Sequence, residues 1–384
     1  MIERESWHEL LACPACGGQL NITVLTPNAE TFCEEGILEC RSCQMWYPVT
    51  NGIPRLFVPG PLRPDDRGFA QKWSGSMGHL QLDQIVQEEP KEDDKAQIQS
   101  TFGHKWTRQA WWGMEGESAE VMAEWLLPRY GWATVDEYKS FMAGRSVMLD
   151  AGCGLGREAL RMAKANADAL VIGLELSECV DEAARHAREQ GVNNVRFIQA
   201  DLMAPPIKSG IVDFIISEGV LHHTPSTKSA FRALVPLLAD KGEFGFYVYR
   251  KKAPIREFTD DYVRDLIKDL PPDQAWSLME PLTALGKTLS DLNIEIEIPE
   301  DVAVLGIKAG HYNLQRLIYY NMFKCYWNDR LTFDENVHVN FDWYHPSYAW
   351  RHTEEEIKSW LEESGLTISY ITVEDSGITV RGKK

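Results

Sequence analysis

Short apolar runs alternate with amphipathic segments through the middle and the end of the chain. The run at 147–150 is followed by apolar residues at helical spacing over 157–163, and the run at 169–175 by a similar segment at 178–190. Strand-length runs that alternate with helices are typical of an α/β domain with a parallel sheet. We therefore predict a doubly wound, mostly parallel sheet of seven strands. The predicted strands begin at residues 147, 169, 195, 212, 242, 367 and 377.

Further helices are predicted around these strands. Segments 118–130 and 134–142 lead into the first strand, and segment 226–238 connects the fourth strand to the fifth. Thr353 and Glu356 have the spacing of a capping box, which predicts the start of the last helix.

A glycine-rich turn, Asp150-Ala-Gly152-Cys-Gly154-Leu-Gly156, follows the first predicted strand. Glycines at alternate positions let the backbone approach a ligand where a Cβ would clash, and the next helix directs its free N–H groups at the turn. A dinucleotide fingerprint is G-x-G-x-x-G, whereas this turn is G-x-G-x-G with a carboxylate ahead of it. That carboxylate would repel a pyrophosphate and attract the ammonium group of an amino acid. A glycine turn without a ligand is the alternative.

The D-x-G-x-G-x-G pattern resembles the first motif of class I S-adenosylmethionine-dependent methyltransferases, which implies their Rossmann-like fold. Glu175 ends the second strand about twenty residues beyond the turn, where a carboxylate can accept both ribose hydroxyls of a nucleoside. In the family that the chain resembles, the acid at the position of Asp201 takes the adenine amino group, and the backbone N–H of Leu202 meets a ring nitrogen. The three acids, in this order and spacing, favour S-adenosylmethionine as the cofactor.

Residues 212–225 resemble the segment that forms the wall beside the reactive methyl group in this family. They add Ser217 to the expected cofactor-binding set and contain two adjacent histidines, of which His223 matches a histidine that many relatives carry. Imidazole titrates near neutral pH, so His223 is a candidate general base for an oxygen or nitrogen nucleophile. The alternative is a histidine that bonds the backbone and shapes the pocket. Further candidate bases are His311, His338 and His345.

Two C-x-x-C pairs lie near the N-terminus, at Cys13 and Cys16 and at Cys40 and Cys43. Each pair places two thiolates on one side of an ion, and two pairs complete a tetrahedral zinc site. Four protein ligands leave no open coordination position, so the predicted Zn²⁺ is structural. Residues 11–57 resemble a zinc-ribbon family of small activators that partner RNA and protein methyltransferases, and that also occur fused ahead of methyltransferase domains. In that family the ribbon is a docking and stabilising module and not a reaction centre.

Two other segments lie outside the core. Prolines and a charged run predict a linker over 59–100, which is followed by Phe102-Gly103-His104-Lys105-Trp106. This element resembles one found ahead of the core in other ribbon-fused methyltransferases, so Trp106 is expected to cover the cofactor or to pack between linker and core. Residues 253–350 are rich in His, Tyr and Trp; in the resembled fold, an insertion here caps the pocket and selects the substrate. A lid core or a dimer interface is the alternative.

The predicted organisation follows the order of these segments. It comprises a zinc ribbon at 1–58, a linker and cofactor-covering segment at 59–117, the methyltransferase core at 118–252, a helical and aromatic lid insertion at 253–350, and a closing helix and strands at 351–384.

Composition narrows the class of protein. The 384 residues include 57 Asp and Glu against 39 Lys and Arg, a formal net charge of −18, which argues against a broad nucleic-acid footprint. No apolar run approaches the roughly 20 residues of a membrane span, and the first residues lack the layout of a signal peptide. Eight cysteines, four of them in metal-type spacing, predict a reducing cytoplasm.

The sequence therefore predicts a methyltransferase that uses S-adenosylmethionine and acts on a small-molecule metabolite of natural-product, sugar or cofactor biosynthesis. In-line transfer in a lidded pocket would rely mainly on orientation. One alternative is a tRNA or rRNA base methyltransferase. Another is a catalytically silent, cofactor-binding partner subunit. A homodimer is a further expectation.

Overall fold

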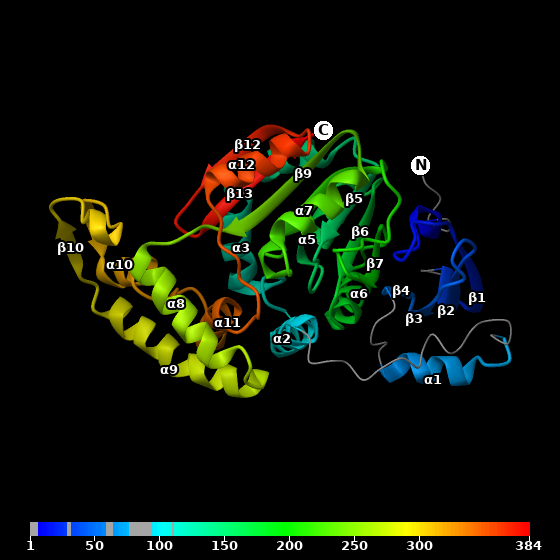
Figure 1. The fold of residues 1–384 in the computed structure, drawn as a ribbon, viewed down its shortest axis with the longest axis horizontal. Helices are drawn as coiled ribbons and strands as arrows, with labels where there is room; N and C mark the ends of the chain where they lie inside the picture. The colour runs from blue at the N-terminus through cyan, green and yellow to red at the C-terminus, as the bar shows by residue number, and fades with distance from the viewer. Residues whose placement is uncertain (1–6, 29–31, 59–63, 77–93, 110) are drawn as a thin grey trace.

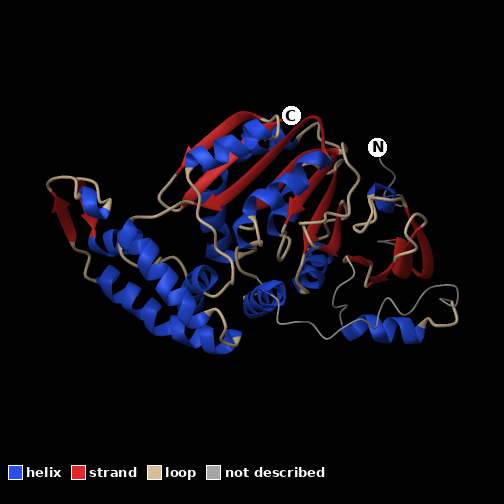
Figure 2. Cartoon of the chain, viewed as in Figure 1, coloured by secondary structure: helices blue, strands red, loops and turns tan. Residues whose placement is uncertain are grey.

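The computed structural model describes residues 7–28, 32–58, 64–76, 94–109 and 111–384. A twisted sheet with helices on both faces occupies the centre, the N-terminal strands lie at one end, and a mainly helical arm lies at the other (Figure 1, Figure 2). The strands of the large sheet are β1 (Leu20–Asn28), β2 (Phe32–Cys40), β3 (Trp46–Thr50), β4 (Ile53–Leu56), β5 (Val147–Ala151), β6 (Leu170–Glu175), β7 (Val195–Ala200), β8 (Val212–Glu218), β9 (Leu238–Tyr249), β12 (Thr367–Val373) and β13 (Gly377–Lys383).

The helices confirm most of the predicted segments. The capping box of the last helix is formed, because Thr353 Oγ1 accepts the Glu356 N–H and the Glu356 carboxylate accepts the Thr353 N–H. The helices are α1 (Pro64–Lys72), α2 (Asp94–Arg108), α3 (Gly116–Arg129), α4 (Val135–Met142), α5 (Arg157–Ala165), α6 (Cys179–Glu189), α7 (Thr227–Leu234), α8 (Pro254–Ile267), α9 (Pro272–Asp291), α10 (Leu314–Asn321), α11 (Phe333–Tyr344) and α12 (Glu354–Glu363).

The sheet has eleven strands in the order β1-β2-β3-β4-β7-β6-β5-β8-β9-β13-β12. The seven strands from β5 onward are the predicted ones, with β13 antiparallel to both β9 and β12. The prediction of a seven-stranded sheet is nevertheless wrong for the whole, because the ribbon joins it: β4 pairs in parallel with β7, with Arg55 opposite Gln199 and Leu56 opposite Ala200. The open hydrogen-bonding edge of β7 explains this addition.

Alternate residues of the parallel strands point to opposite faces, and each face has its own core. Leu149 and Ile172 pack in the cluster that includes α7 and α12 residues, and this cluster continues into the ribbon. Met148 and Val171 pack on the other face with α3, α4, α5 and α6. The chain moves from β5 to β6 on one side and to β8 on the other, so a crevice opens beyond the carboxyl ends of these strands, where α/β sheets bind ligands.

The segment predicted as a linker contains secondary structure. Helix α1 packs Phe69 and Ala70 against Ile37 and Trp46 of the ribbon, so 64–72 belongs to the ribbon's core. Residues 77–93, which include the charged run, lie outside the described part of the chain.

The insertion after β9 consists of α8 to α11 and a hairpin of β10 (Glu295–Ile298) and β11 (Gly310–Asn313). It has a separate core in which Trp276, Phe341 and Tyr344 pack together with Tyr249 from the end of β9. Helix α10 of the insertion ends at Asn321. Within the described ranges, no helix has both the length and the apolar character needed to cross a bilayer.

Candidate functional site

A cavity of about 420 Å³ lies beyond the carboxyl ends of the parallel strands. Its walls come from the loops after β5, β6, β7 and β8, from α2, and from the insertion. This volume lies within the range of about 300–1,000 Å³ that is usual for small-molecule sites.

The glycine turn forms one wall of the cavity. Gly152 and Gly154 both have positive φ, and a Cβ on Gly152 would lie 2.3 Å from a methyl group of Val220, so only glycine fits there. The indole of Trp106, from α2, lies 3.3 Å from the position that a Cβ on Gly154 would take. Trp106 therefore lies over the turn and lines the cavity, as one of its two predicted roles requires.

The three strand-end acids all line the cavity. Asp150 is 2% exposed and accepts the Ala159 N–H at 2.9 Å; burial, reinforced by Glu158, raises the pKa of Asp150 well above its ordinary value. A cation beside Asp150 would remove that penalty, which fits the ammonium group of an amino-acid moiety.

The other two acids keep acceptor capacity. Glu175 accepts the backbone N–H groups of Gly154 at 3.0 Å and Ser177 at 2.8 Å, and Asp201 accepts that of Met203 at 2.9 Å. A carboxylate offers about four lone-pair sites, so both can also accept hydroxyl or amino protons. The predicted Leu202 lines the cavity beside Asp201.

Two of the predicted cofactor residues do not line the cavity. Gly156 starts α5 with φ of 84°, and a Cβ there would lie 3.1 Å from Ala183, so this glycine serves close packing. Ser217 is fully buried and its Oγ donates to the Ala151 carbonyl at 2.8 Å. Both residues therefore support the cavity wall without lining the cavity.

His223 is one of two candidate bases that the structure places in the cavity wall. Its Nδ1 lies 2.7 Å from the Tyr348 carbonyl oxygen, which can only accept, so Nδ1 carries a proton and Nε2 has a free lone pair. Nε2 is buried without a hydrogen-bond partner among the described residues. Burial lowers the pKa of His223 to about 4, which keeps the ring neutral.

The other candidate histidines differ in their positions. His311 is exposed on β11, away from the cavity lining. His345 is buried between Thr101 Oγ1 and the Leu270 carbonyl oxygen, each 2.9 Å away, so it ties α2 to the insertion. His338 does line the cavity, and its ring stacks on Trp112 with centroids 4.8 Å apart.

Charged groups that sequence reasoning did not assign also line the cavity. Lys105 and Asp342 form a buried ion pair at 2.5 Å, and the Tyr249 hydroxyl donates to Asp342 at 3.0 Å. Burial acts to raise the pKa of Asp342, but Lys105, His223 and His338 together outweigh it and hold the pKa well below its ordinary value. Lys324 lies in the same wall. Its position between apolar neighbours, Phe323 and Cys325, is a sequence signal that could have identified it.

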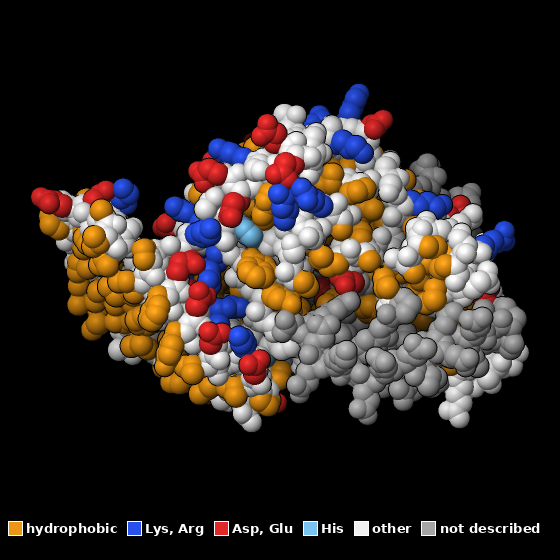
Figure 3. All heavy atoms as spheres, in the orientation of Figure 1, with side chains coloured by type: hydrophobic (Ala, Val, Ile, Leu, Met, Phe, Trp, Pro, Cys, Tyr) orange, Lys and Arg blue, Asp and Glu red, His pale blue; other side chains and the backbone are white. Residues whose placement is uncertain are grey.

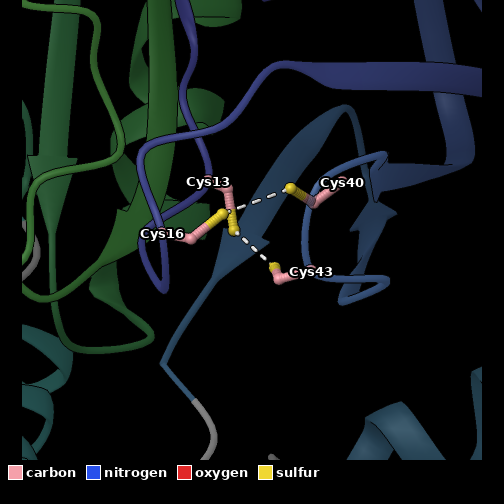
Figure 4. Close-up of side chains that lie close together, drawn as sticks. All are labelled: Cys13, Cys16, Cys40 and Cys43. Atoms are coloured by element: carbon pink, nitrogen blue, oxygen red, sulfur yellow. Dashed lines mark hydrogen bonds between the residues drawn. The ribbon is translucent and has the colours of Figure 1, made fainter.

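The four ribbon cysteines converge at the other end of the molecule (Figure 4). Their sulfur atoms all lie within 4.8 Å of one another, with Cys13 to Cys43 at 3.6 Å and Cys16 to Cys40 at 3.5 Å. Zn–S bonds of about 2.3 Å in a tetrahedron place sulfurs roughly 3.8 Å apart, so this set fits Zn²⁺. The Tyr47 hydroxyl lies 3.1 Å from Cys13 Sγ, where it can donate to a thiolate.

Comparisons with known proteins agree with this arrangement. Residues 144–271 match the methyltransferase domain family, and residues 5–52 match the Trm112p-like protein family.

Curated relatives and a solved structure are also similar. The chain is 30% identical over 139 residues to a ubiquinone biosynthesis O-methyltransferase of Acinetobacter baylyi, covering 35% of this chain and 56% of that protein. It is 26% identical over 136 residues to the tRNA (carboxymethyluridine(34)-5-O)-methyltransferase ALKBH8 of Mus musculus, covering 35% and 19%. The magnesium protoporphyrin IX methyltransferase structure from Synechocystis PCC 6803, with bound SAM, has 16% identity and a TM-score of 0.42, covering 77% of this chain and all of that one.

The chain spans about half the length, or less, of the curated relatives that it matches. Its two family matches coincide with the cysteine cluster and with the strands that surround the cavity. The protein therefore contains a methyltransferase domain preceded by a Trm112p-like domain.

Proposed function

We propose that this protein is an S-adenosylmethionine-dependent methyltransferase that acts on a small-molecule metabolite. The observation that carries the proposal is the convergence of the glycine turn and three strand-end carboxylates on one cavity, which continues beneath the insertion. The substrate would enter the part of the cavity bounded by the insertion.

The residues of the cavity at the carboxyl ends of β5, β6 and β7 fit the separate chemical groups of the cofactor. Asp150 would hold its ammonium group, Glu175 its ribose hydroxyls, and Asp201 with the Leu202 N–H its adenine. Trp106 would cover it from α2. When bound, S-adenosylmethionine supplies an electrophilic methyl carbon next to a sulfonium.

The chain's own contribution to the reaction would be orientation, exclusion of water and removal of one proton. Two aromatic side chains that line the cavity, Trp112 from the loop after α2 and His338 from α11, stack on each other and restrict water. Nε2 of His223 would accept the proton of the substrate nucleophile, because that atom is neutral and has no partner among the described residues. In the proposed mechanism, His311 and His345 have no part.

The zinc ribbon is proposed to be structural. All four ligands come from the protein, and the strands they connect extend the methyltransferase sheet. Since none of the eight cysteines, all of which the structure describes, forms a disulfide, a reducing compartment such as the cytoplasm suits the protein.

We also propose that the protein forms a homodimer, and one observation favours this. Leu278, Leu285 and Leu292 recur every seven residues on α9 and are 42–51% exposed. Hydrophobic side chains gather over the insertion in Figure 3. Sedimentation equilibrium of the wild-type protein and of Leu285→Lys decides this point: two monomeric proteins would contradict it.

A tRNA methyltransferase is the second candidate, because one relative has that activity in its name and the Trm112p-like domain is present. The net charge of −18 weighs against it. A salt-sensitive gel shift with tRNA would favour this candidate over a metabolite.

Calorimetric titration with S-adenosylhomocysteine tests the proposal, followed by transfer of labelled methyl groups to a metabolite extract. Binding and labelling of small molecules are expected. Binding without turnover would favour a silent partner subunit, and the absence of binding would refute the methyltransferase proposal.

A further inference from the structure

The half of the cavity under the insertion is lined by cations. Lys252, Arg256 and Lys324 all lie in its wall, although the protein as a whole carries a net charge of −18. Arg256 is 1% exposed and Lys324 is 5% exposed, so neither charge is simply solvated. The rings of Tyr319, Tyr326 and Trp343 complete this wall.

Two of these cations have partners within the protein. Arg256 Nε donates to Asp260 at 2.6 Å, and Asp260 also accepts from Trp343 and Tyr344, so this carboxylate already has three donors within the protein. Lys252 Nζ donates to the Ser376 carbonyl at 2.8 Å, which is a dipole and supplies no negative charge. Burial, together with the charges of Arg256 and Lys324, lowers the pKa of Lys252 well below its ordinary value, so an anion in the cavity would favour its charged form.

Lys324 is different. Among the described residues, its ammonium has no hydrogen-bond or ion-pair partner, and its Nζ lies 4.7 Å from the centroid of the Trp343 ring. Asp342 is close enough to act on it electrostatically, but Lys105 and Tyr249 already bind that carboxylate. A buried ammonium without a counter-charge is costly, and natural proteins pair such groups or use them to bind ligands.

Titration behaviour agrees with this geometry. Burial lowers the pKa of Lys324 to about 7, and Arg256 and Lys105 add to the effect while Asp342 and Asp260 oppose it. The ammonium is therefore only partly protonated near neutral pH, and an incoming anion would raise the pKa and complete its protonation.

We propose that the insertion end of the cavity binds an oxygen anion of the substrate, a carboxylate or a phosphate, through Lys324. Lys252 and Arg256 supply positive potential, and the tyrosine and tryptophan rings contact an apolar or aromatic body. The methyl acceptor is accordingly an acidic small molecule. This inference rests on the proposed methyltransferase function and specifies its substrate class.

Benzoate, benzamide and phenyl phosphate test the inference, because they share one ring and differ in charge. Each is titrated calorimetrically into protein saturated with S-adenosylhomocysteine. The variants are Lys324→Met and Lys324→Arg. Lys308→Met is the matched control, since Lys308 is 79% exposed, belongs to the same insertion and pairs with Asp301.

The wild-type protein should bind the better of the two anions about ten-fold or more tighter than benzamide. Lys324→Met should remove that preference, Lys324→Arg should keep part of it, and Lys308→Met should leave it intact. Near pH 7, the wild-type protein should take up protons when the anion binds, which titrations in two buffers of different ionisation enthalpy reveal. The anion that binds more tightly shows whether the site prefers a carboxylate or a phosphate.

Equal affinities for anion and amide in the wild-type protein would overturn the inference, as would a preference that survives Lys324→Met or the absence of binding by all three probes. The wild-type comparison stands even where Lys324→Met does not fold. Binding of S-adenosylhomocysteine is measured first, so a protein that binds it but ignores ligand charge refutes only the anion site. A protein that does not bind it refutes the methyltransferase proposal.

Discussion

At the end of β6, the Glu175 carboxylate is held by two backbone N–H groups and lines the cavity. Glu175→Gln keeps the size of the side chain but replaces one acceptor oxygen with an NH₂ donor, which opposes one of those N–H groups. We expect S-adenosylhomocysteine to bind roughly ten- to hundred-fold more weakly, as measured by calorimetry. Asp240→Asn, at an exposed acid, is the control and should bind normally.

His223 should make stability depend on pH. Its pKa is lowered to about 4 by burial, whereas an unfolded histidine titrates near 6.5. Between these values only the unfolded chain binds the proton, so the free energy of unfolding falls as the pH drops from about 6.5 to about 4.

His223→Gln can still donate to the Tyr348 carbonyl oxygen but cannot titrate, so it should lose less stability than the wild type over that pH range. Urea unfolding at about pH 7 and about pH 5 measures both losses. Other buried histidines contribute equally to the two proteins. Equal losses would therefore mean that His223 is not held neutral in the folded state.

Single residues differ in how well their place in the site can be predicted from the sequence. Asp150 and Glu175 were predictable because each ends an apolar run, and strand ends of a parallel sheet meet at one edge. The position of His345 was not predictable, because it stands in an aromatic-rich segment and only the packing of α11 on α8 and α9 puts it behind the wall. For Lys324 the apolar neighbours were the only signal, and they do not indicate which cavity it lines.

Arg55, on strand β4, should contribute to the stability of the protein because it links the ribbon to the core. Its guanidinium is buried, donates twice to Asp181 at 2.6 and 3.0 Å, and contacts Gln199 at 2.9 Å. Arg55→Met leaves these acceptors without their donor. We expect a loss of about 2 kcal/mol in the free energy of unfolding, less than for a fully buried pair because Asp181 is 32% exposed.

Arg185→Met is the matched control on α6, since Arg185 forms exposed ion pairs with Glu182 and Glu189. It should cost no more than about 0.5 kcal/mol. Denaturant unfolding of both variants compares the two costs. A similar, small cost for both would mean that the Arg55 contact does not hold the ribbon to the core.

The elements themselves were largely predictable because their signals are local. Alternating apolar runs indicate strands wherever they lie, and the Thr353 and Glu356 box defines a helix start within four residues. The pairing of β4 with β7 was not predictable, because nothing within residues 53–56 indicates a partner some 140 positions away. Helix α1 was missed because its proline and its charges resemble a linker, whereas Phe69 decides its packing.

On the scale of the whole molecule, metal binding should stabilise both domains together, since ribbon residues and core residues share one apolar cluster. Cys40→Ser is expected to lose Zn²⁺ and to lower the melting temperature of the entire protein in a single transition. Metal analysis and calorimetry measure these effects. Cys33 lies outside the group of four cysteines, so Cys33→Ser should keep its zinc. Full zinc occupancy in Cys40→Ser would remove Cys40 from the ligand set.

Because β4 pairs with Gln199 and Ala200, it covers the carboxyl end of the outer edge of β7. Unsatisfied strand edges recruit foreign strands and seed aggregation. The ribbon moves the exposed edge outward to β1, where Pro27 and two register shifts make it a poor template. Besides bringing the four cysteines together, these N-terminal strands are expected to guard against polymerisation, and a chain shortened to begin at the first core helix should expose the carboxyl end of β7 and self-associate.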